Sequence, residues 1–128
     1  MITVVTDAKI DSIHQEEMMI LEALMKQIQV KDIEAITPLF TKFVEHMQEH
    51  FAYEEERMKE ASYPMFTIHQ AEHYKVLNEA RYQLMMWQSK PDLWELREYL
   101  SEDFVEWIHQ HIDAMDVAMI DFFDKGEA

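Results

Sequence analysis

The sequence predicts an all-α protein, folded as an antiparallel up-down-up-down four-helix bundle. The chain of 128 residues contains one Gly and three Pro, and it is rich in good helix formers such as Leu, Met, Glu and Gln. Apolar residues recur at three- and four-residue spacing between the prolines, as they do on amphipathic helices. The length suits one core, so we expect a single domain over residues 1–128.

The three prolines divide the chain into a short N-terminal arm and four expected helices. The arm is residues 1–10, and the helices cover roughly residues 11–30, 38–61, 64–88 and 92–123. Thr37 followed by Pro38 is typical of an N-cap and a first-turn proline, so the second helix is predicted to begin there. The segments around Pro64 and Pro91 interrupt the periodicity in the same way, and Lys31-Asp32 marks the first connection.

Composition excludes several classes of protein. The chain has no Cys, which excludes disulfides, thiolate zinc sites and iron–sulfur clusters. A formal net charge of −15 repels nucleic acid and anionic lipid, so we expect no nucleic-acid partner. We find no apolar run long enough to span a bilayer and no signal-peptide pattern in residues 1–10, so we expect no membrane insertion and a cytoplasmic location.

Each expected helix carries ionisable residues on its apolar stripe. The fourth stripe, for example, runs through Leu93, Leu100, Phe104, Trp107, His111, Met115, Ala118 and Phe122. A single His on such a stripe is more often a hydrogen-bonded core residue than a ligand. Here six ionisable residues occupy four stripes: His14, His50, Glu54, His69, His73 and His111.

These six residues are expected at one level of the bundle. They fall early in the first and third helices and late in the second and fourth, which in an antiparallel bundle is the same end. Burying so many ionisable groups is costly unless they are paired, hydrogen-bonded or bound to a metal. The pattern therefore predicts a metal site. His46 lies at the edge of its stripe, and His109 and Asp113 point away from His111, so we interpret these three as solvated or outside the ligand set.

The motifs resemble those of the bacterial hemerythrins over nearly the whole chain. The matching segments are Ile10–His14, His50–Glu55, Met58, Tyr63-Pro64, His69–His73, and Trp107–Ile112 followed by Asp116. The resemblance implies two iron ions with a bridging oxo or hydroxo group and dioxygen as the ligand. It also implies that Glu54 and Asp116 bridge the metals and that His14, His50, His69, His73 and His111 are terminal ligands. Such a ligand set leaves one coordination position open for dioxygen. From spacing alone, Asp116 lies about 140° from His111 around an α-helix and would not be placed in the core.

The donor types leave the metal open. Imidazole and carboxylate suit iron but also accept zinc or manganese. The dioxygen pocket is expected to be walled by Phe51, Trp107, Ile108 and Ile112, which can equally be ordinary core residues. Ferritin-type carboxylate bundles need two ExxH pairs, whereas the only ExxH here, Glu106 to His109, points away from the stripe.

We therefore expect a protein that binds dioxygen reversibly for storage, transport, delivery or sensing, rather than an enzyme. Its oxygen-accepting protein partner, if it has one, is unknown. Two alternatives stay open. One is a di-iron redox enzyme acting on peroxide or nitric oxide, and the other is a binding module that uses the metal only for folding.

Overall fold

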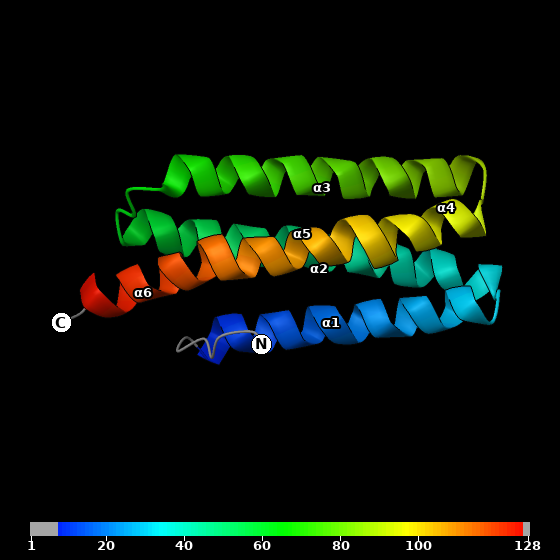
Figure 1. Cartoon of the computed structure of the whole chain (residues 1–128), viewed down its shortest axis with the longest axis horizontal. Coiled ribbons are helices and arrows are strands. Elements are labelled where there is room, and N and C mark those ends of the chain that lie inside the picture. The colour runs from blue at the N-terminus through cyan, green and yellow to red at the C-terminus, as the bar shows by residue number, and fades with distance from the viewer. Residues whose placement is uncertain (1–7, 127–128) are drawn as a thin grey trace.

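The computed structural model describes residues 8–126, with the side chains of Ile112 and Asp113 outside that description. Three continuous helices come first: α1 (Ala8–Gln29), α2 (Ile33–Glu60) and α3 (Phe66–Ser89). The fourth helical segment consists of α4 (Leu93–Glu98), η1 (Tyr99–Phe104), α5 (Val105–His111), η2 (Ile112–Asp116) and α6 (Val117–Gly126). The four segments run alternately in opposite directions, as an up-down-up-down bundle (Figure 1). The prediction of an all-α four-helix bundle is confirmed.

Two helices begin before their predicted positions. The second helix begins at Ile33, not at Pro38, because Asp32 is its N-cap and accepts a hydrogen bond from the Ala35 amide at 3.2 Å. Thr37 instead lies inside α2, where its hydroxyl accepts a hydrogen bond from Trp87 Nε1 at 2.9 Å. The first helix extends back to Ala8, so the predicted arm is shorter than expected, and residues 1–7 lie outside the described part.

Two helix ends use the left-handed region without glycine. Lys31 has φ 61° and Ser62 has φ 52°, and each follows the end of a helix. Both ends have the paired backbone hydrogen bonds of a Schellman motif; after α1 these are Asp32 N to Gln27 O at 3.0 Å and Lys31 N to Ile28 O at 3.2 Å. The two turns therefore reverse the chain at opposite ends of the bundle with residues that are less suited than Gly to positive φ.

The fourth helical segment departs from α-helical geometry twice. Its segments η1 and η2 are π-helical, and a π-helical turn holds more residues than an α-helical turn. This difference shifts the buried face after His111: Asp116, Met119, Ile120 and Phe123 are buried. The predicted stripe was wrong in this stretch, because Ala118 is exposed and Met115 and Phe122 are only half-buried.

The core has three layers along the bundle axis. A large apolar cluster extends from Leu21 in α1 to Ile108 in α5. A smaller apolar cluster closes one end and consists of Ile10, Met58, Tyr63, Met119, Ile120 and Phe123. The third layer consists of buried ionisable residues from all four helical segments, which we call the polar layer: His14, Glu17, His50, Glu54, His69, His73, His111 and Asp116.

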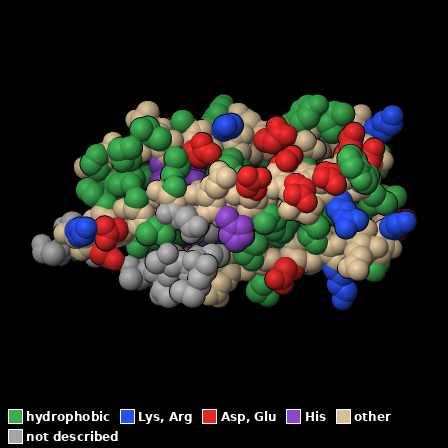
Figure 2. Space-filling model, viewed as in Figure 1, with side chains coloured by type: hydrophobic (Ala, Val, Ile, Leu, Met, Phe, Trp, Pro, Cys, Tyr) green, Lys and Arg blue, Asp and Glu red, His purple; other side chains and the backbone are tan. Residues whose placement is uncertain are grey.

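No helix in the described part of the chain is both long and apolar enough to cross a membrane. Acidic side chains are spread over the face seen in Figure 2, where His side chains show only in small areas.

Candidate metal centre

All seven residues expected as ligands lie in the polar layer. Their exposure is 9% or less of the reference value in each case, and Glu54 and Asp116 are fully buried. They come from all four helical segments: His14 from α1, His50 and Glu54 from α2, His69 and His73 from α3, and His111 and Asp116 from α5 and η2. The structure therefore places these seven side chains together, including Asp116, which helical spacing alone would not place in the core.

The side chains form two groups that share both carboxylates. One group is His14, His50, Glu54 and Asp116, and the other is Glu54, His69, His73, His111 and Asp116. Within each group, the candidate ligand atoms lie within 4.8 Å of one another. Each group thus has the donors and the spacing to hold one metal ion.

The Glu54 carboxylate turns one oxygen toward each group. Oε1 is 3.2 Å from His73 Nε2 and 3.5 Å from His69 Nε2. Oε2 is 3.5 Å from His14 Nε2 and also contacts His50 Nε2. A carboxylate held in this way can bridge two cations, with one oxygen on each.

Asp116 repeats the arrangement from the opposite helix. Its Oδ1 is 2.9 Å from His111 Nε2 and 3.1 Å from His69 Nε2, whereas Oδ2 is 3.3 Å from His14 Nε2. The π-helical segment η2 makes this possible. A step of five residues slightly exceeds one wide turn there, so Asp116 follows His111 on nearly the same face.

Buried atoms without hydrogen bonds show that a cation fits the site. Among the described residues, His14 Nε2, His73 Nε2, Glu54 Oε1 and both Asp116 carboxylate oxygens are buried and have no hydrogen-bond partner. In addition, Nε2 of His69 and Nε2 of His111 face each other at 3.2 Å. Buried polar groups are normally paired because leaving them unpaired is costly. Metal ions coordinated by these nitrogens and oxygens would satisfy all of them together.

Electrostatics in the metal-free protein are dominated by the two shared carboxylates. Burial lowers the pKa of His14 and His69, but the nearby carboxylates of Asp116 and Glu54 outweigh it and raise each pKa to about 9. Burial has the opposite effect on Glu54, yet the charge of His50 and contacts with other His side chains hold its pKa well below the usual range. The carboxylates are thus ionised and ready to bind a cation.

The aromatic residues expected to wall the pocket pack directly on the candidate ligands. Phe51 stacks on His73, with ring centroids 4.0 Å apart and 5° between planes. Trp107 stacks on His111 at 4.6 Å and 19°, and its Nε1 donates to Glu72 Oε1 at 2.5 Å. Ile108 is buried in the adjoining apolar cluster. The side chain of Ile112 lies outside the described residues.

The residues set aside by sequence analysis differ among themselves. His109 is exposed, and the Asp113 side chain lies outside the description. His46 is half-buried, with Nε2 3.2 Å from Glu16 Oε2 and Nδ1 3.5 Å from Glu17 Oε2. Neither His46 nor His109 is part of either ligand group.

Sequence analysis missed Glu17, which lies in the polar layer at 2% exposure. Its Oε2 is 2.5 Å from His50 Nδ1, on the side of the ring away from Glu54. The available signal was spacing, because Glu17 follows His14 by three residues and so shares its face of α1.

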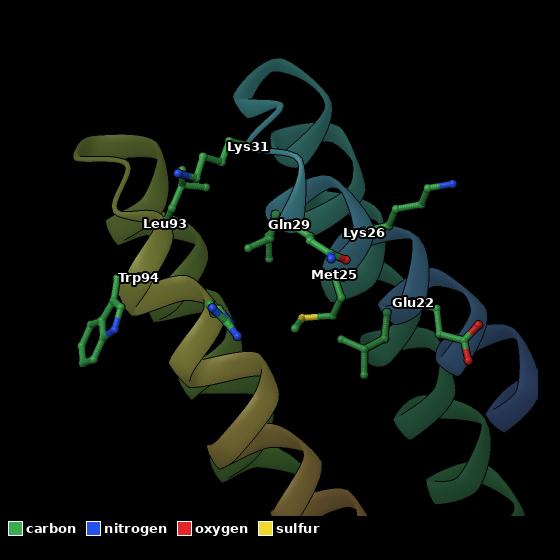
Figure 3. Close-up of a pocket in the computed structure, with 10 residues that line it drawn as sticks. Glu22, Met25, Lys26, Gln29, Lys31, Leu93 and Trp94 are labelled. Carbon is green, nitrogen blue, oxygen red and sulfur yellow. The ribbon is translucent and has the colours of Figure 1, made fainter.

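A separate groove lies at the other end of the bundle, between the end of α1 and the start of α4 (Figure 3). It encloses about 940 Å³ and is lined by apolar residues such as Leu21, Met25 and Leu93, together with Lys31 and Arg97. No member of the two ligand groups lines this groove. The groove is therefore separate from the candidate metal centre in the polar layer.

Comparison with known proteins agrees with the site. A family model described as the hemerythrin HHE cation binding domain matches residues 6–122. The chain belongs to the hemerythrin family. Among curated proteins it is similar to the bacteriohemerythrin of Aquifex aeolicus (strain VF5), at 28% identity over 106 residues, which is 83% of this chain and 81% of that protein. No solved structure matches the chain. The chain is accordingly a hemerythrin-family protein whose buried His and carboxylate cluster could hold metal.

Proposed function

We propose that this hemerythrin binds dioxygen reversibly at two iron ions joined by an oxo or hydroxo bridge. His14 and His50 would hold one ion, His69, His73 and His111 the other, and Glu54 and Asp116 would bridge them. The observation that carries the proposal is the division of each buried carboxylate, with one oxygen facing each group of imidazoles. Iron in such a pair supplies the electrons and the open coordination position that dioxygen needs.

The surrounding side chains support reversible binding rather than turnover. Five of the seven candidate ligands are His side chains, which would bind iron as neutral imidazoles and stabilise oxidised iron less than additional carboxylates would. Phe51 and Ile108 are buried beside the ligands, and Trp107 covers His111. An apolar wall excludes water and protons and so slows irreversible oxidation of the iron. We propose storage, delivery or sensing of dioxygen in the cytoplasm as the biological use.

An absorption spectrum tests the proposal directly. The protein is loaded with ferrous iron without air, and spectra are recorded before air, after air and after deoxygenation. A visible charge-transfer band that appears with air and disappears on deoxygenation is expected, with two irons per chain by metal analysis. Zinc-loaded protein is the control and should show no band. Irreversible oxidation without a reversible band would contradict the proposal and favour a redox enzyme acting on peroxide or nitric oxide.

A further inference from the structure

Glu17 is a buried acid outside both ligand groups. It lies one turn after His14 in α1 and is 2% exposed. Its Oε2 is 2.5 Å from Nδ1 of His50, and the other ring nitrogen of His50 contacts Glu54 within the ligand group. The His50 ring therefore lies between two carboxylates, one inside the candidate metal site and one behind it.

We propose that Glu17 is a positioning residue for the metal site and acts through His50. It accepts the Nδ1–H of His50, which fixes the tautomer that presents an unprotonated Nε2 to the metal. Its negative charge also makes the imidazole a stronger donor. The inference rests on the metal-binding role of the cluster and does not depend on dioxygen binding.

The position of Glu17 makes the two ligand groups unequal. In the group of three imidazoles, Nδ1 of His69 and Nδ1 of His111 have no hydrogen-bond partner among the described residues. His73 Nδ1 does face a carboxylate, Glu55 Oε2 at 3.2 Å, but that side chain is 22% exposed. The fully buried carboxylate thus stands behind the group with two imidazoles. It supplies negative charge to the metal position that has fewer nitrogen donors.

The surroundings of Glu17 show that its carboxylate is held against His50. His46 Nδ1 lies 3.5 Å from the same Oε2, and His46 in turn contacts Glu16 at the surface. Glu17 Oε1 is buried and has no hydrogen-bond partner among the described residues. Burying a carboxylate is costly, and a neutral side chain of similar shape would fill this position without that cost. A negative charge that acts on the metal site through His50 explains why a carboxylate is buried at this position.

Zinc affinity of the whole chain provides the test, measured by competition with a chromogenic chelator. Glu17→Gln keeps the shape and an acceptor oxygen but removes the charge. We expect the weaker of the two zinc sites to lose about 10–100-fold in affinity. Glu16→Gln is the matched control, because Glu16 is the neighbouring residue with a 65% exposed side chain. It should change affinity by less than about twofold.

The reduction potential of the iron-loaded protein is the second readout. Loss of the Glu17 charge should make the potential more positive, because ferric iron is stabilised less, and Glu16→Gln should leave it unchanged. Glu17→Met serves as a second variant and should shift both quantities in the same direction. Zinc affinity and potential that are the same in Glu17→Gln as in Glu16→Gln would overturn the proposal. A fall in zinc affinity without any reversible dioxygen spectrum would contradict the proposed function and leave the role of Glu17 supported.

Discussion

The polar layer and the large apolar cluster use the same four helices but differ in what completes them. In the large cluster, Phe40, Phe43 and Leu100 are fully buried, and their partners are other apolar side chains. In the polar layer, buried nitrogens and oxygens face one another without full hydrogen bonding. The apolar cluster is therefore complete in the polypeptide alone, whereas the polar layer has buried polar atoms that bound cations would satisfy. We expect the first region to carry most of the stability of the metal-free fold and the second to bind metal.

The largest expected effect is loss of metal from the polar layer. His111→Ala removes a nitrogen from the group of three imidazoles and should reduce bound metal by about one ion per chain. His109→Ala, two residues away and exposed, is the control and should keep full metal content. Metal analysis after removal of free ions measures both. Loss of metal in the His109 variant alone would overturn the assignment of the fourth helical segment.

A cavity in the large apolar cluster should act on stability instead. Phe43→Ala removes a fully buried ring that packs edge-on against Phe104 at 5.0 Å. We expect the free energy of unfolding to fall by about 3–5 kcal/mol. The loss should be similar in metal-free and zinc-loaded protein, as urea unfolding of each form would show. A much larger loss in the zinc-loaded form would mean that the two regions are not independent.

The stability of the metal-free protein should depend on pH through the polar layer. His14 and His69 have folded pKa values of about 9, above the ordinary 6.5. Their contribution is complete below pH 6.5 and is lost as pH rises through 9. For Glu17, burial raises the pKa but His50 and His46 lower it to about 2, below the ordinary 4.5. Its contribution is present above pH 4.5 and is lost as pH falls through 2.

Urea midpoints of the metal-free protein across this range measure the effect. They should be highest between pH 4.5 and 6.5 and should decline on either side. The zinc-loaded protein should vary less on the alkaline side, because the metal replaces the protons on His14 and His69. A midpoint in the metal-free protein that rises steadily from pH 6.5 to 9 would contradict the reasoning.

Ile108, at the boundary between the large apolar cluster and the polar layer, should slow the oxidation of bound iron. Ile108 is buried one turn before His111 and belongs to the large apolar cluster. Replacing it with Thr places a hydroxyl near the ligands, so water and protons should reach the site more easily and the iron should oxidise several-fold faster. Decay of the air-induced visible band gives the rate. Leu100→Thr, deeper in the same cluster, is the control, and equal rates in the two variants would disprove this role for Ile108.

The smallest expected effect concerns the two turns with positive φ. Ser62→Gly at the end with the polar layer and Lys31→Gly at the opposite end both relieve a left-handed residue. Each should raise the free energy of unfolding by up to about 1 kcal/mol. Because the two turns have the same hydrogen bonding, thermal unfolding should show gains of similar size. A loss of stability in either variant would show that its side chain makes a contribution beyond the turn.

The first three helices and the polar layer were largely predictable because α-helical periodicity determines which residues share a face. His14, His50, Glu54, His69, His73 and His111 were all predicted from stripes, and all six are buried together. Local signals were less reliable, since Thr37-Pro38 has the pattern of a helix start but lies inside α2. Asp32, three residues before Ala35, provides the N-cap instead.

The sequence by itself determined the fold class and the level at which most of the candidate ligands lie, because these depend on regular spacing along single helices. Only the tertiary structure decided three further points. The π-helical segment η2 brings Asp116 onto the face of His111, where α-helical spacing would not place it. The carboxylates of Glu54 and Asp116 each face two groups of imidazoles, and Glu17 of α1 contacts His50 of α2. Such contacts depend on how the helices pack and on π-helical turns. The three- and four-residue spacing of apolar residues gives no information about either.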